Sequence, residues 1–308
     1  MKKVAFIFPG QGSQSIGMGK DFFDSSDVAR EMIGASSDRL GFDFKELLFE
    51  ENDRLEQTMF TQPAILLVSA IAHKLFENEM EIKPIFALGH SLGEFSALCS
   101  VGALDSVDGV ELVHQRGKLM QEACSGVDAG MMALIGLDDE KIEEITATAR
   151  DEGKKVWAAN YNSDGQVVIA GIKSDLSALE SSFKDAGAKR AILLNMSVAS
   201  HCPLLESAVL PLEKNLQKFI KDEFISPVIS NVTASGYESK DVSISLLAKQ
   251  LTQPVLYKQS ITRFEDDIDL FIEFGGNVLK GLNRRSTKKP THSIVDMKSL
   301  QEAFELMS

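Results

Sequence analysis

A serine set between two glycines is the most chemically suggestive feature of the sequence. Gly89, Ser91 and Gly93 fit the pattern G-x-S-x-G, which places a nucleophilic serine in a sharp turn between a strand and a helix. The glycines keep bulky side chains out of the turn, and the N-terminus of the helix directs partial positive charge at the hydroxyl. The alternative is a tight Gly-Ser turn that only caps a helix. A buried strand predicted before the turn and a helix predicted after it favour the nucleophile.

A serine hydroxyl needs a base, and the chain has five histidines. His201 is the candidate because it lies in a predicted loop after a strand and follows Ser91 in the order typical of hydrolase-like folds. A surface histidine is the competing interpretation. We expect the side chain of His90, inside the turn, to point away from Ser91. No Asp or Glu is clearly a third member, so the sequence predicts a dyad whose histidine is oriented by another group, such as a backbone carbonyl.

An acyl-transfer serine also needs backbone N–H groups that bind the developing oxyanion. Leu92, directly after the serine, is expected to supply one of them. The loop of Gly10, Gln11 and Gly12 after the first predicted strand is the best source of the second. Its glycine spacing does not fit a dinucleotide-binding motif, and no Walker A motif follows it.

An arginine lies on the apolar face of the helix predicted over residues 107–124. Val113, Arg116 and Met120 share this face at helical spacing. A buried arginine is costly unless it is paired, so one interpretation is a snorkelling or salt-bridged side chain. The other is a clamp whose planar guanidinium binds a substrate carboxylate through two hydrogen bonds. The clamp would make the acyl group a dicarboxylic half-ester or thioester.

The elements around these residues predict two units of α/β structure. Apolar runs at Val4–Phe8 and 85–88 alternate with helices at 62–76, 92–100 and 107–124, as in a parallel sheet covered on both faces. An inserted unit from 126 to 197 has the order β-α-β-β-α-β of a ferredoxin-like fold. Its predicted elements are strand 131–136, helix 138–151, strands 156–161 and 166–170 joined across 162–165, helix 173–186 and strand 190–196. Beyond it the predicted strands are 224–230, 270–273 and 293–296, with helices at 278–283 and 299–307. The predicted domains are therefore 1–125 with 198–308, and 126–197.

Composition narrows the possible partners. The chain has 308 residues and a net charge of −13 at pH 7, which disfavours nucleic acid and anionic lipid because phosphate binding needs clustered positive charge. Cys99, Cys124 and Cys202 are scattered and predict neither a disulfide framework nor a metal site. The longest apolar stretch, 64–72, is too short to cross a bilayer. We expect a cytoplasmic protein without metal or cofactor that contacts neither nucleic acid nor membrane.

Several motifs together resemble one family, the malonyl-CoA:acyl carrier protein transacylases of bacterial type II fatty acid synthesis. The resemblance extends from Val4 to about Arg285. The motifs are F-P-G-Q-G-S-Q at 8–14, T-Q-P-A at 61–64, G-H-S-L-G-E at 89–94, Q-R-G-K-L-M-Q at 115–121, N-Y-N-S at 160–163 and S-H at 200–201.

The resemblance implies an α/β-hydrolase-like large domain, a ferredoxin-like small domain and a two-step transfer through a malonyl-serine ester. Ser91 would attack malonyl-CoA, and the phosphopantetheine thiol of the carrier protein would then accept the malonyl group. His201 would be the base and acid, oriented by the main-chain carbonyl of Gln250. The remaining residues that it implies are Gln11 and Leu92 as oxyanion donors, Arg116 as malonate clamp, and Gln62, Asn160 and Asn162 at the substrate.

Two alternatives to malonyl transfer remain open from the sequence. One is a serine esterase or thioesterase that releases acyl groups to water, and the other is an inactive scaffold that binds carrier protein. A local basic cluster is expected to dock the acidic carrier despite the net negative charge, unless it is only a solvated charged turn. The cluster consists of Lys280, Arg284, Arg285, Lys288 and Lys289.

Overall fold

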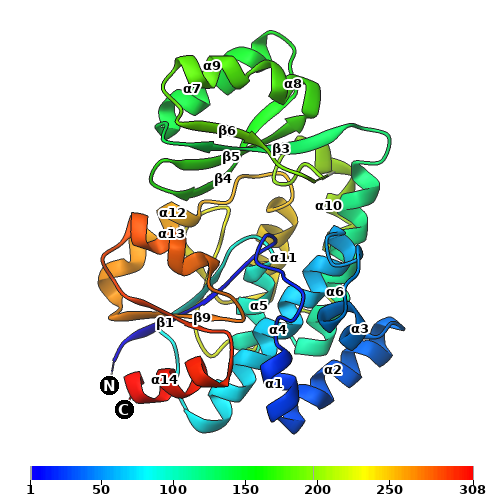
Figure 1. Ribbon diagram of the computed structural model, residues 1–308, viewed down its shortest axis with the longest axis vertical. Helices are drawn as coiled ribbons and strands as arrows, with labels where there is room; N and C mark the ends of the chain where they lie inside the picture. The colour runs from blue at the N-terminus through cyan, green and yellow to red at the C-terminus, as the bar shows by residue number, and fades with distance from the viewer. Residues whose placement is uncertain (1, 197, 308) are drawn as a thin grey trace.

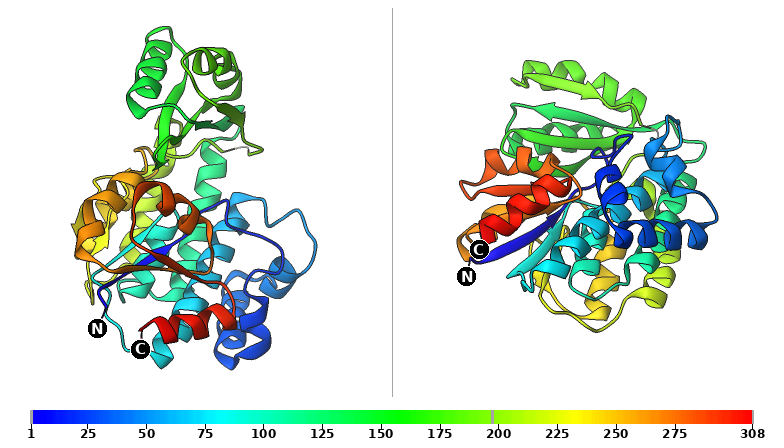
Figure 2. Two further views of the ribbon diagram at one scale, coloured as in Figure 1. Left: turned by 60° about the vertical axis from the view of Figure 1, so that its left-hand side comes forward. Right: turned by 60° about the horizontal axis from the view of Figure 1, so that its bottom comes forward.

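A computed structural model of the chain describes residues 2–196 and 198–307 and contains two sheets (Figure 1). The larger sheet and most of the helices form the lower part of the molecule in Figure 1. The smaller sheet and its helices lie above them. The two ends of the chain lie near one another at the foot of the large unit, as the three ribbon views agree (Figure 2).

The larger sheet carries the strand whose end leads into the Gly89–Gly93 turn. Its order is β10-β9-β1-β2-β7-β8, and all neighbours are parallel except β7 and β8. A parallel sheet of this kind confirms the predicted fold class for the large unit. The strands are β1 (Val4–Phe8), β2 (Phe86–Gly89), β7 (Val228–Ile229), β8 (Gly236–Tyr237), β9 (Leu270–Phe274) and β10 (Thr291–Ile294).

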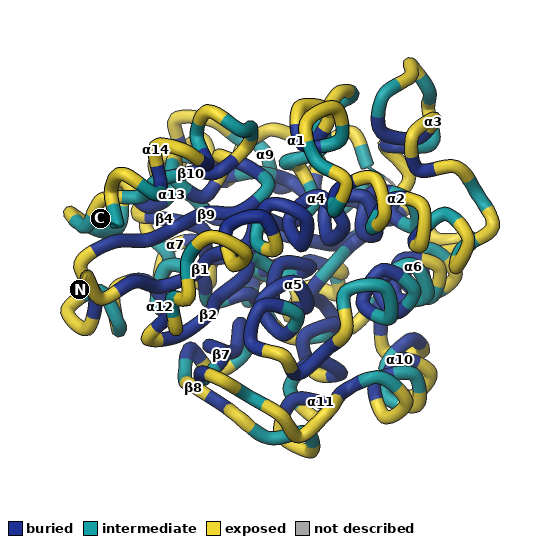
Figure 3. Tube along the Cα trace, turned by 90° about the horizontal axis from the view of Figure 1, so that it is seen from below, coloured by how far each residue is buried: buried dark blue, intermediate teal, exposed yellow. Residues whose placement is uncertain are grey.

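Strand β1 shows why its sequence is apolar at every position. Phe6 and Phe8 pack into the core cluster that includes the long helix α4 (Thr58–Glu79), whereas Ala5 and Ile7 pack into a second cluster on the opposite face. Side chains alternate between the faces of a strand, so a sheet covered on both sides needs a continuous apolar run. Figure 3 shows β1, β2 and α5 as buried segments at the centre of the molecule.

Helices pack around both faces of this sheet. Six of them, α1 to α3 and α10 to α12, have no counterpart in the sequence predictions. Besides α4, the helices of the large unit are α1 (Lys20–Ser25), α2 (Asp27–Leu40), α3 (Phe44–Phe49), α5 (Gly93–Ser100), α6 (Ser106–Ala123), α10 (Glu206–Phe219), α11 (Lys240–Lys249), α12 (Tyr257–Phe264), α13 (Val278–Ser286) and α14 (Met297–Met307).

Helix α4 begins at Thr58 and not at Gln62, so the predicted start of this helix was wrong. Pro63 therefore lies inside the helix and leaves the carbonyl oxygen of Met59 without its usual N–H donor. The Nδ1 atom of His114 on α6 lies 2.7 Å from this oxygen and satisfies it. Helix α4 is also long and apolar enough to cross a membrane by composition, but 83% of its most apolar window is buried within the fold.

The smaller sheet confirms the ferredoxin-like element order. It is antiparallel throughout, with the order β4-β5-β3-β6, and helices α7, α8 and α9 cover the face that points upward in Figure 1. The opposite face turns toward the large unit. The elements are β3 (Ala129–Ile135), α7 (Asp139–Asp151), β4 (Val156–Ser163), β5 (Gln166–Ile172), α8 (Lys173–Ala178), α9 (Glu180–Asp185) and β6 (Arg190–Leu193).

Several predicted boundaries differ from the structure. The hairpin turn is shorter than predicted, because β4 continues through Ser163, and the helix predicted over 173–186 is divided at Leu179. The strand predicted over 224–230 keeps only Val228–Ile229. Pro227 has no N–H to donate, and the Ile225 N–H bonds to the Val101 carbonyl oxygen after α5. The division of the chain at 125/126 and 197/198 stays a prediction, and residues 1, 197 and 308 lie outside the described part of the chain.

A backbone ladder fastens the small sheet to the large unit. The Tyr161 N–H donates to the Val255 carbonyl oxygen at 2.9 Å, and the Val255 N–H donates to the Ala159 carbonyl oxygen at 2.8 Å. Next to this ladder, Lys258 on α12 forms an ion pair of 2.5 Å with Asp139 at the start of α7. Strand β4 is thereby held by the segment between α11 and α12.

Candidate active site

Ser91 lies at the sharp turn between β2 and α5, as the glycine pattern predicts. Its φ of 53° lies in the left-handed region, which is uncommon for a residue other than glycine. The backbone passes so closely through the turn that a Cβ atom on Gly89 would lie 1.7 Å from the carbonyl carbon of Gly93. A Cβ atom on Gly93 would lie 2.0 Å from the carbonyl oxygen of Phe8 on β1. There is therefore no room for a side chain at Gly89 or Gly93.

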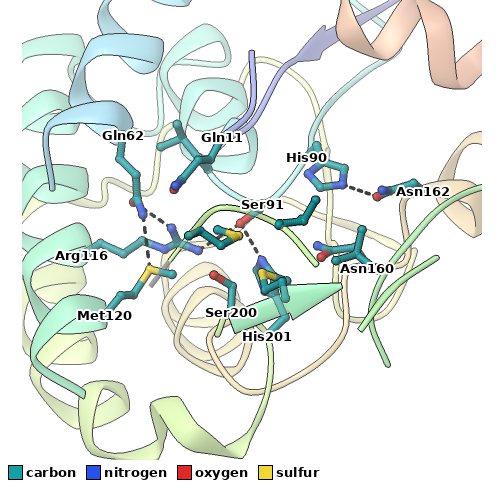
Figure 4. Close-up of a pocket in the computed structure, with 15 residues that line it drawn as sticks. Gln11, Gln62, His90, Ser91, Arg116, Met120, Asn160, Asn162, Ser200 and His201 are labelled. Carbon is teal, nitrogen blue, oxygen red and sulfur yellow. Dashed lines mark hydrogen bonds between the residues drawn. The ribbon is translucent and has the colours of Figure 1, made fainter. Parts of the chain in front are cut away.

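His201 and Ser91 form a hydrogen-bonded pair (Figure 4). The Nε2 atom of His201 lies 2.8 Å from the Ser91 Oγ, and the Nδ1 atom lies 2.7 Å from the carbonyl oxygen of Gln250, at the end of α11. Because a carbonyl only accepts, Nδ1 carries the proton and Nε2 is free to accept the serine proton. No carboxylate takes part in these two contacts.

The charge environment keeps the His201 imidazole neutral. Burial, and after it the positive charge of Arg116, lowers the pKa of His201 to about 3, while the hydrogen bond to the Gln250 carbonyl opposes this shift. A neutral imidazole is the form that can accept a proton from Ser91. The dyad is therefore ready to act as a base at neutral pH.

Arg116 on α6 is buried to 1% exposure and directs its guanidinium at the serine. Its Nη2 atom donates to the Ser91 Oγ at 3.2 Å and to the Gln250 Oε1 at 3.0 Å, and its Nη1 atom donates to the Gln62 Oε1 at 2.8 Å. In the described part of the chain, no carboxylate oxygen lies within 4.0 Å of this guanidinium, so the salt-bridge interpretation does not apply. Burial lowers the pKa of Arg116 to about 10, so it stays charged at neutral pH.

Gln62 on α4 is held in a fixed orientation between two side chains. Its Oε1 accepts from Arg116, while its Nε2 donates to the Sδ atom of Met120 at 3.3 Å. Figure 4 shows Gln62, Arg116 and Met120 together on one side of Ser91. Met120 comes from the same apolar face of α6 as Arg116, and a thioether sulfur is a weak acceptor. Sequence patterns alone do not suggest this contact.

Gln11 and Leu92 both line the pocket beside Ser91. Within the described residues, the backbone N–H groups of Gln11 and Leu92 have no hydrogen-bond partner. Unpaired N–H groups beside a nucleophile are the arrangement that binds an oxyanion. The Gln11 side chain is tied back by a 3.2 Å bond from its Nε2 to the Thr58 Oγ1.

The small sheet supplies another wall of the pocket. Asn160 and Asn162 lie two residues apart on β4, so their side chains share the face that turns to the large unit. His90 lines the same pocket, and its Nε2 lies 2.7 Å from the Asn162 Oδ1. The hydrogen bond of the His90 ring goes to Asn162 and not to Ser91, so the expectation that this side chain points away from Ser91 stays a prediction, while its ring lines the pocket (Figure 4).

Every predicted site residue except one lines this pocket. The exception is Gln250, which is fully buried behind Ser91 and contributes both its carbonyl and its side chain. Residues that sequence reasoning missed at the pocket are Met131, Val168, Leu194, Met196 and Ser200.

Behind the serine lie three further residues that sequence reasoning missed, Glu94, Asn231 and Tyr237. All three are buried, and the Asn231 N–H and the Tyr237 hydroxyl both donate to the Glu94 carboxylate. Burial raises the pKa of Glu94 to about 7, although the bonds from Asn231, Gln250 and Tyr237 oppose this shift. One signal could have drawn attention to Glu94, because it is a charged residue within the otherwise uncharged helix 93–100.

Comparison with known proteins identifies the family. The acyl transferase domain family matches residues 5–292. Two curated malonyl CoA-acyl carrier protein transacylases match nearly end to end. The protein from Bacillus subtilis is 36% identical over 312 residues, with coverage of 100% of this chain and 98% of the relative. The protein from Escherichia coli K12 is 38% identical over 306 residues, with coverage of 98% and 99%. The chain belongs to the malonyl-CoA:acyl carrier protein transacylases.

Solved structures of this transacylase family have the same fold. The transacylase from Helicobacter pylori has a TM-score of 0.97 and 47% identity, with coverage of 100% of this chain and 99% of that one. A malonyl-transacylase in complex with a type II PKS acyl-carrier protein has a TM-score of 0.94 and 35% identity, with coverage of 99% of each chain. The resemblance inferred from the motifs is confirmed, as is the fold that it implied.

Proposed function

We propose that the chain transfers the malonyl group of malonyl-CoA to the phosphopantetheine thiol of acyl carrier protein and supplies fatty acid biosynthesis. The observation that carries this proposal is the buried guanidinium of Arg116, which lies 3.2 Å from the nucleophile without a carboxylate partner within 4.0 Å among the described residues. A buried cation needs an anion to offset its desolvation. The free carboxylate of a malonyl thioester supplies one, and its carbonyl carbon then lies at the Ser91 hydroxyl.

In the first half-reaction, Ser91 is acylated. The Oγ atom attacks the thioester carbonyl while its proton passes to Nε2 of His201, and the N–H groups of Gln11 and Leu92 bind the oxyanion. The carbon–sulfur bond then breaks, and the CoA sulfur leaves with the proton from His201. The products are a malonyl-serine ester, free CoA thiol and a neutral His201, so the dyad is ready for the second step.

In the second half-reaction, the carrier protein takes the malonyl group. Its phosphopantetheine thiol gives its proton to Nε2 of His201 and attacks the ester carbonyl, with the same two N–H groups at the oxyanion. The Ser91 oxygen leaves and recovers the proton from His201. The Gln250 carbonyl keeps the imidazole oriented throughout, because its contact is at Nδ1, which carries a proton in both charge states.

The amides around the pocket orient the acyl group in this scheme. Gln62 fixes Nη1 of the Arg116 guanidinium, and the Nη2 N–H that donates to the Ser91 Oγ is placed to meet the substrate carboxylate. Asn160 and Asn162 extend from the small sheet toward the thioester and its pantetheine arm. These side chains can exchange hydrogen bonds with polar groups of the substrate at little cost, because amides both donate and accept.

Intact-protein mass spectrometry tests the proposal. Incubation with malonyl-CoA should add one malonyl group, Ser91→Ala should abolish the adduct, and added carrier protein should remove the adduct and itself become malonylated. If hydrolysis to free malonate were the main outcome without carrier protein, the result would support an esterase or thioesterase instead. Binding of carrier protein without any adduct would support an inactive scaffold.

The basic cluster at α13 is our candidate for the carrier-docking surface. Arg284, Arg285 and Lys288 are exposed, and none of the five cluster residues has a carboxylate within 4.0 Å in the parts of the chain that the structure describes. Free positive charge on a protein of net charge −13 offers an acidic partner one local attraction. Four of the five residues border a shared surface hollow, together with Glu265 and Asp266.

Charge reversal tests this docking surface. Arg284→Glu with Lys288→Glu should raise the KM for carrier protein severalfold, and the effect should shrink at high salt. The rate of Ser91 acylation by malonyl-CoA should not change, because the carrier takes no part in that step. Lys298→Glu on α14, which is 85% exposed, is the matched control and should leave both steps unaltered. An unchanged KM in the double variant would remove the cluster from docking.

We also propose the domain division at 125/126 and 197/198 and a cytoplasmic location. The antiparallel sheet between Ala129 and Leu193 supports the first, because its strands pair with one another and touch the large unit through the ladder at Val255. The burial of α4 within the fold supports the second.

A further inference from the structure

Two buried amides hold the strained backbone of Ser91 from both sides. The Ser91 N–H donates to the Oδ1 of Asn231 at 2.6 Å, and the Ser91 carbonyl oxygen accepts from the Nε2 of Gln250 at 3.1 Å. Asn231 also donates from its Nδ2 to the Gly89 carbonyl oxygen at 2.7 Å. Both amide residues are 0% exposed. The φ of 53° at Ser91 is therefore maintained by side chains that arrive from outside the turn.

The side chain of Gln250 links this turn to the other groups of the site. Its Oε1 accepts from the Nη2 of Arg116 at 3.0 Å, and its main-chain oxygen accepts from the Nδ1 of His201 at 2.7 Å. One residue thus contacts the nucleophile, the base and the clamp. Which way its amide faces decides whether Arg116 meets an acceptor or a donor.

Glu94 holds the side-chain amide of Gln250 and the backbone N–H of Asn231. Its Oε2 accepts from the Gln250 Nε2 at 2.7 Å and from the Asn231 N–H at 3.1 Å, and its Oε1 accepts from the Tyr237 hydroxyl at 2.9 Å. An amide NH₂ turns toward a carboxylate, so the Gln250 Oε1 is left facing Arg116. Glu94 is fully buried and does not line the pocket.

We propose that Glu94 is a positioning residue, which aligns the Ser91 turn with the Arg116 clamp by holding the side-chain amide of Gln250 and the backbone N–H of Asn231. It touches no reacting atom and acts only through these two residues. The length of the Glu94 side chain is the essential property, because its one carboxyl group must contact three donors that come from the end of α11, from β8 and from the loop after β7. This inference rests on the proposed acylation of Ser91.

Two substitutions distinguish the effect of the Glu94 side-chain length from the effect of its charge. Glu94→Asp keeps the charge but shortens the side chain by one methylene, so the carboxylate cannot meet all three donors. It should slow the single-turnover acylation of Ser91 at saturating malonyl-CoA by about 100-fold, the loss expected from a misplacement of roughly 1 Å. Glu94→Gln keeps the length and an acceptor oxygen for Gln250 and Asn231, and it should acylate within about fivefold of the wild type.

A second buried glutamate supplies the control for a purely structural effect. Glu273 on β9 is also 0% exposed, and its carboxylate accepts from the N–H groups of Leu279 and Lys280 and from the Ser293 hydroxyl, all within 3.0 Å. Glu273→Asp should lower the melting temperature as Glu94→Asp does. Its acylation rate per folded molecule should stay within about threefold of the wild type.

The readouts are the maximal acylation rate, the apparent affinity for malonyl-CoA and the fraction folded. The inference is supported if the maximal acylation rate falls in Glu94→Asp but stays near the wild-type value in Glu94→Gln. Wild-type acylation by Glu94→Asp would overturn it, as would equal slowing of Glu94→Gln, or of Glu273→Asp. If Glu94→Asp does not fold, Glu94→Gln still decides, since a large loss there contradicts the inference and near-normal acylation supports it. Absence of an adduct on the wild type would instead overturn the proposed function.

Discussion

The Nε2 atom of His201 lies 2.8 Å from the Oγ of Ser91, and both residues have a left-handed backbone, with φ of 60° and 53°. For residues other than glycine this conformation costs about 1–2 kcal/mol each. Buried hydrogen bonds to Gln250 and Asn231 hold the Ser91 backbone and the His201 imidazole in place. The base and the nucleophile therefore meet because the surrounding fold maintains strain in both, and changes to those partners should affect the pair together.

Removal of the clamp should distinguish malonyl from acetyl groups. Arg116→Ala should lower kcat/KM for malonyl-CoA by roughly 10- to 100-fold, because a hydrogen bond to a charged group contributes about 1.5–3 kcal/mol. Acetyl-CoA has no carboxylate, so its slower transfer should change much less. Arg39→Ala, which breaks ion pairs of an arginine on the more exposed helix α2, is the control. Equal loss for both substrates would exclude the clamp.

The acylation rate should not follow the ordinary titration of histidine. The pKa of His201 is lowered to about 3, so its neutral form persists far below the usual pKa of 6.5. We expect the rate of acylation by acetyl-CoA to be nearly constant between about pH 5 and about pH 8. In Arg116→Ala the loss of the neighbouring positive charge should move the acidic limb to higher pH. A limb near pH 6.5 in the wild type would contradict this assignment.

Two Gly→Ala substitutions should differ in outcome, since one should damage the active-site turn and the other should stabilise the fold. A Cβ atom at Gly89 would lie 1.7 Å from backbone of Gly93, so Gly89→Ala should distort the turn and abolish the malonyl adduct. Gly34 lies exposed within helix α2, and its Cβ would meet no atom within 4 Å. Gly34→Ala should therefore raise the free energy of unfolding by about 0.5–1 kcal/mol. Denaturant unfolding with adduct mass spectrometry measures both, and an active Gly89→Ala would argue against the tight turn.

Acidification should destabilise the fold in part through His73. Its ring packs against those of Phe6 and Phe274, with centroids 5.5 and 5.3 Å away, and burial lowers its pKa to about 4. The unfolded chain binds the proton more tightly, so this contribution to stability is complete above pH 6.5 and declines as the pH falls toward 4. His73→Leu should lose stability less steeply over this range than the wild type. Phe76→Leu alters the same ring cluster without removing a titrating group and should keep the wild-type slope.

Local patterns were sufficient for the parts of the fold that carry strong periodicity or special turns. The buried run of β1, the glycine turn at Ser91 and the element order of the small sheet were predictable because each is written in consecutive residues. Three of the missed helices carry weak or misleading signals. Helices α1 and α3 have six residues each, too few to show a helical period, and Pro211 lies inside α10, where proline ordinarily argues against a helix.

The site divides in the same way. The pocket residues that were predicted lie in sequence motifs, whereas the layer behind Ser91 depends on contacts between distant parts of the chain. Glu94 meets Asn231 and Gln250 across 137 and 156 residues of sequence. Nothing near Glu94 in the sequence indicates which donors it faces. The partner of His90 was unpredictable for a related reason, because Asn162 comes from the small sheet.

The ladder between β4 and Val255 has a consequence for chimeric enzymes. Asn160 on the small sheet and the Gln250 carbonyl on the large unit belong to segments that exchange backbone hydrogen bonds only a few residues away. A graft that replaces the residues between Ala129 and Leu193 with those of a relative would place a foreign edge strand against this seam. We expect such grafts to retain acyl selectivity only when the residues around Val255 are transplanted with them.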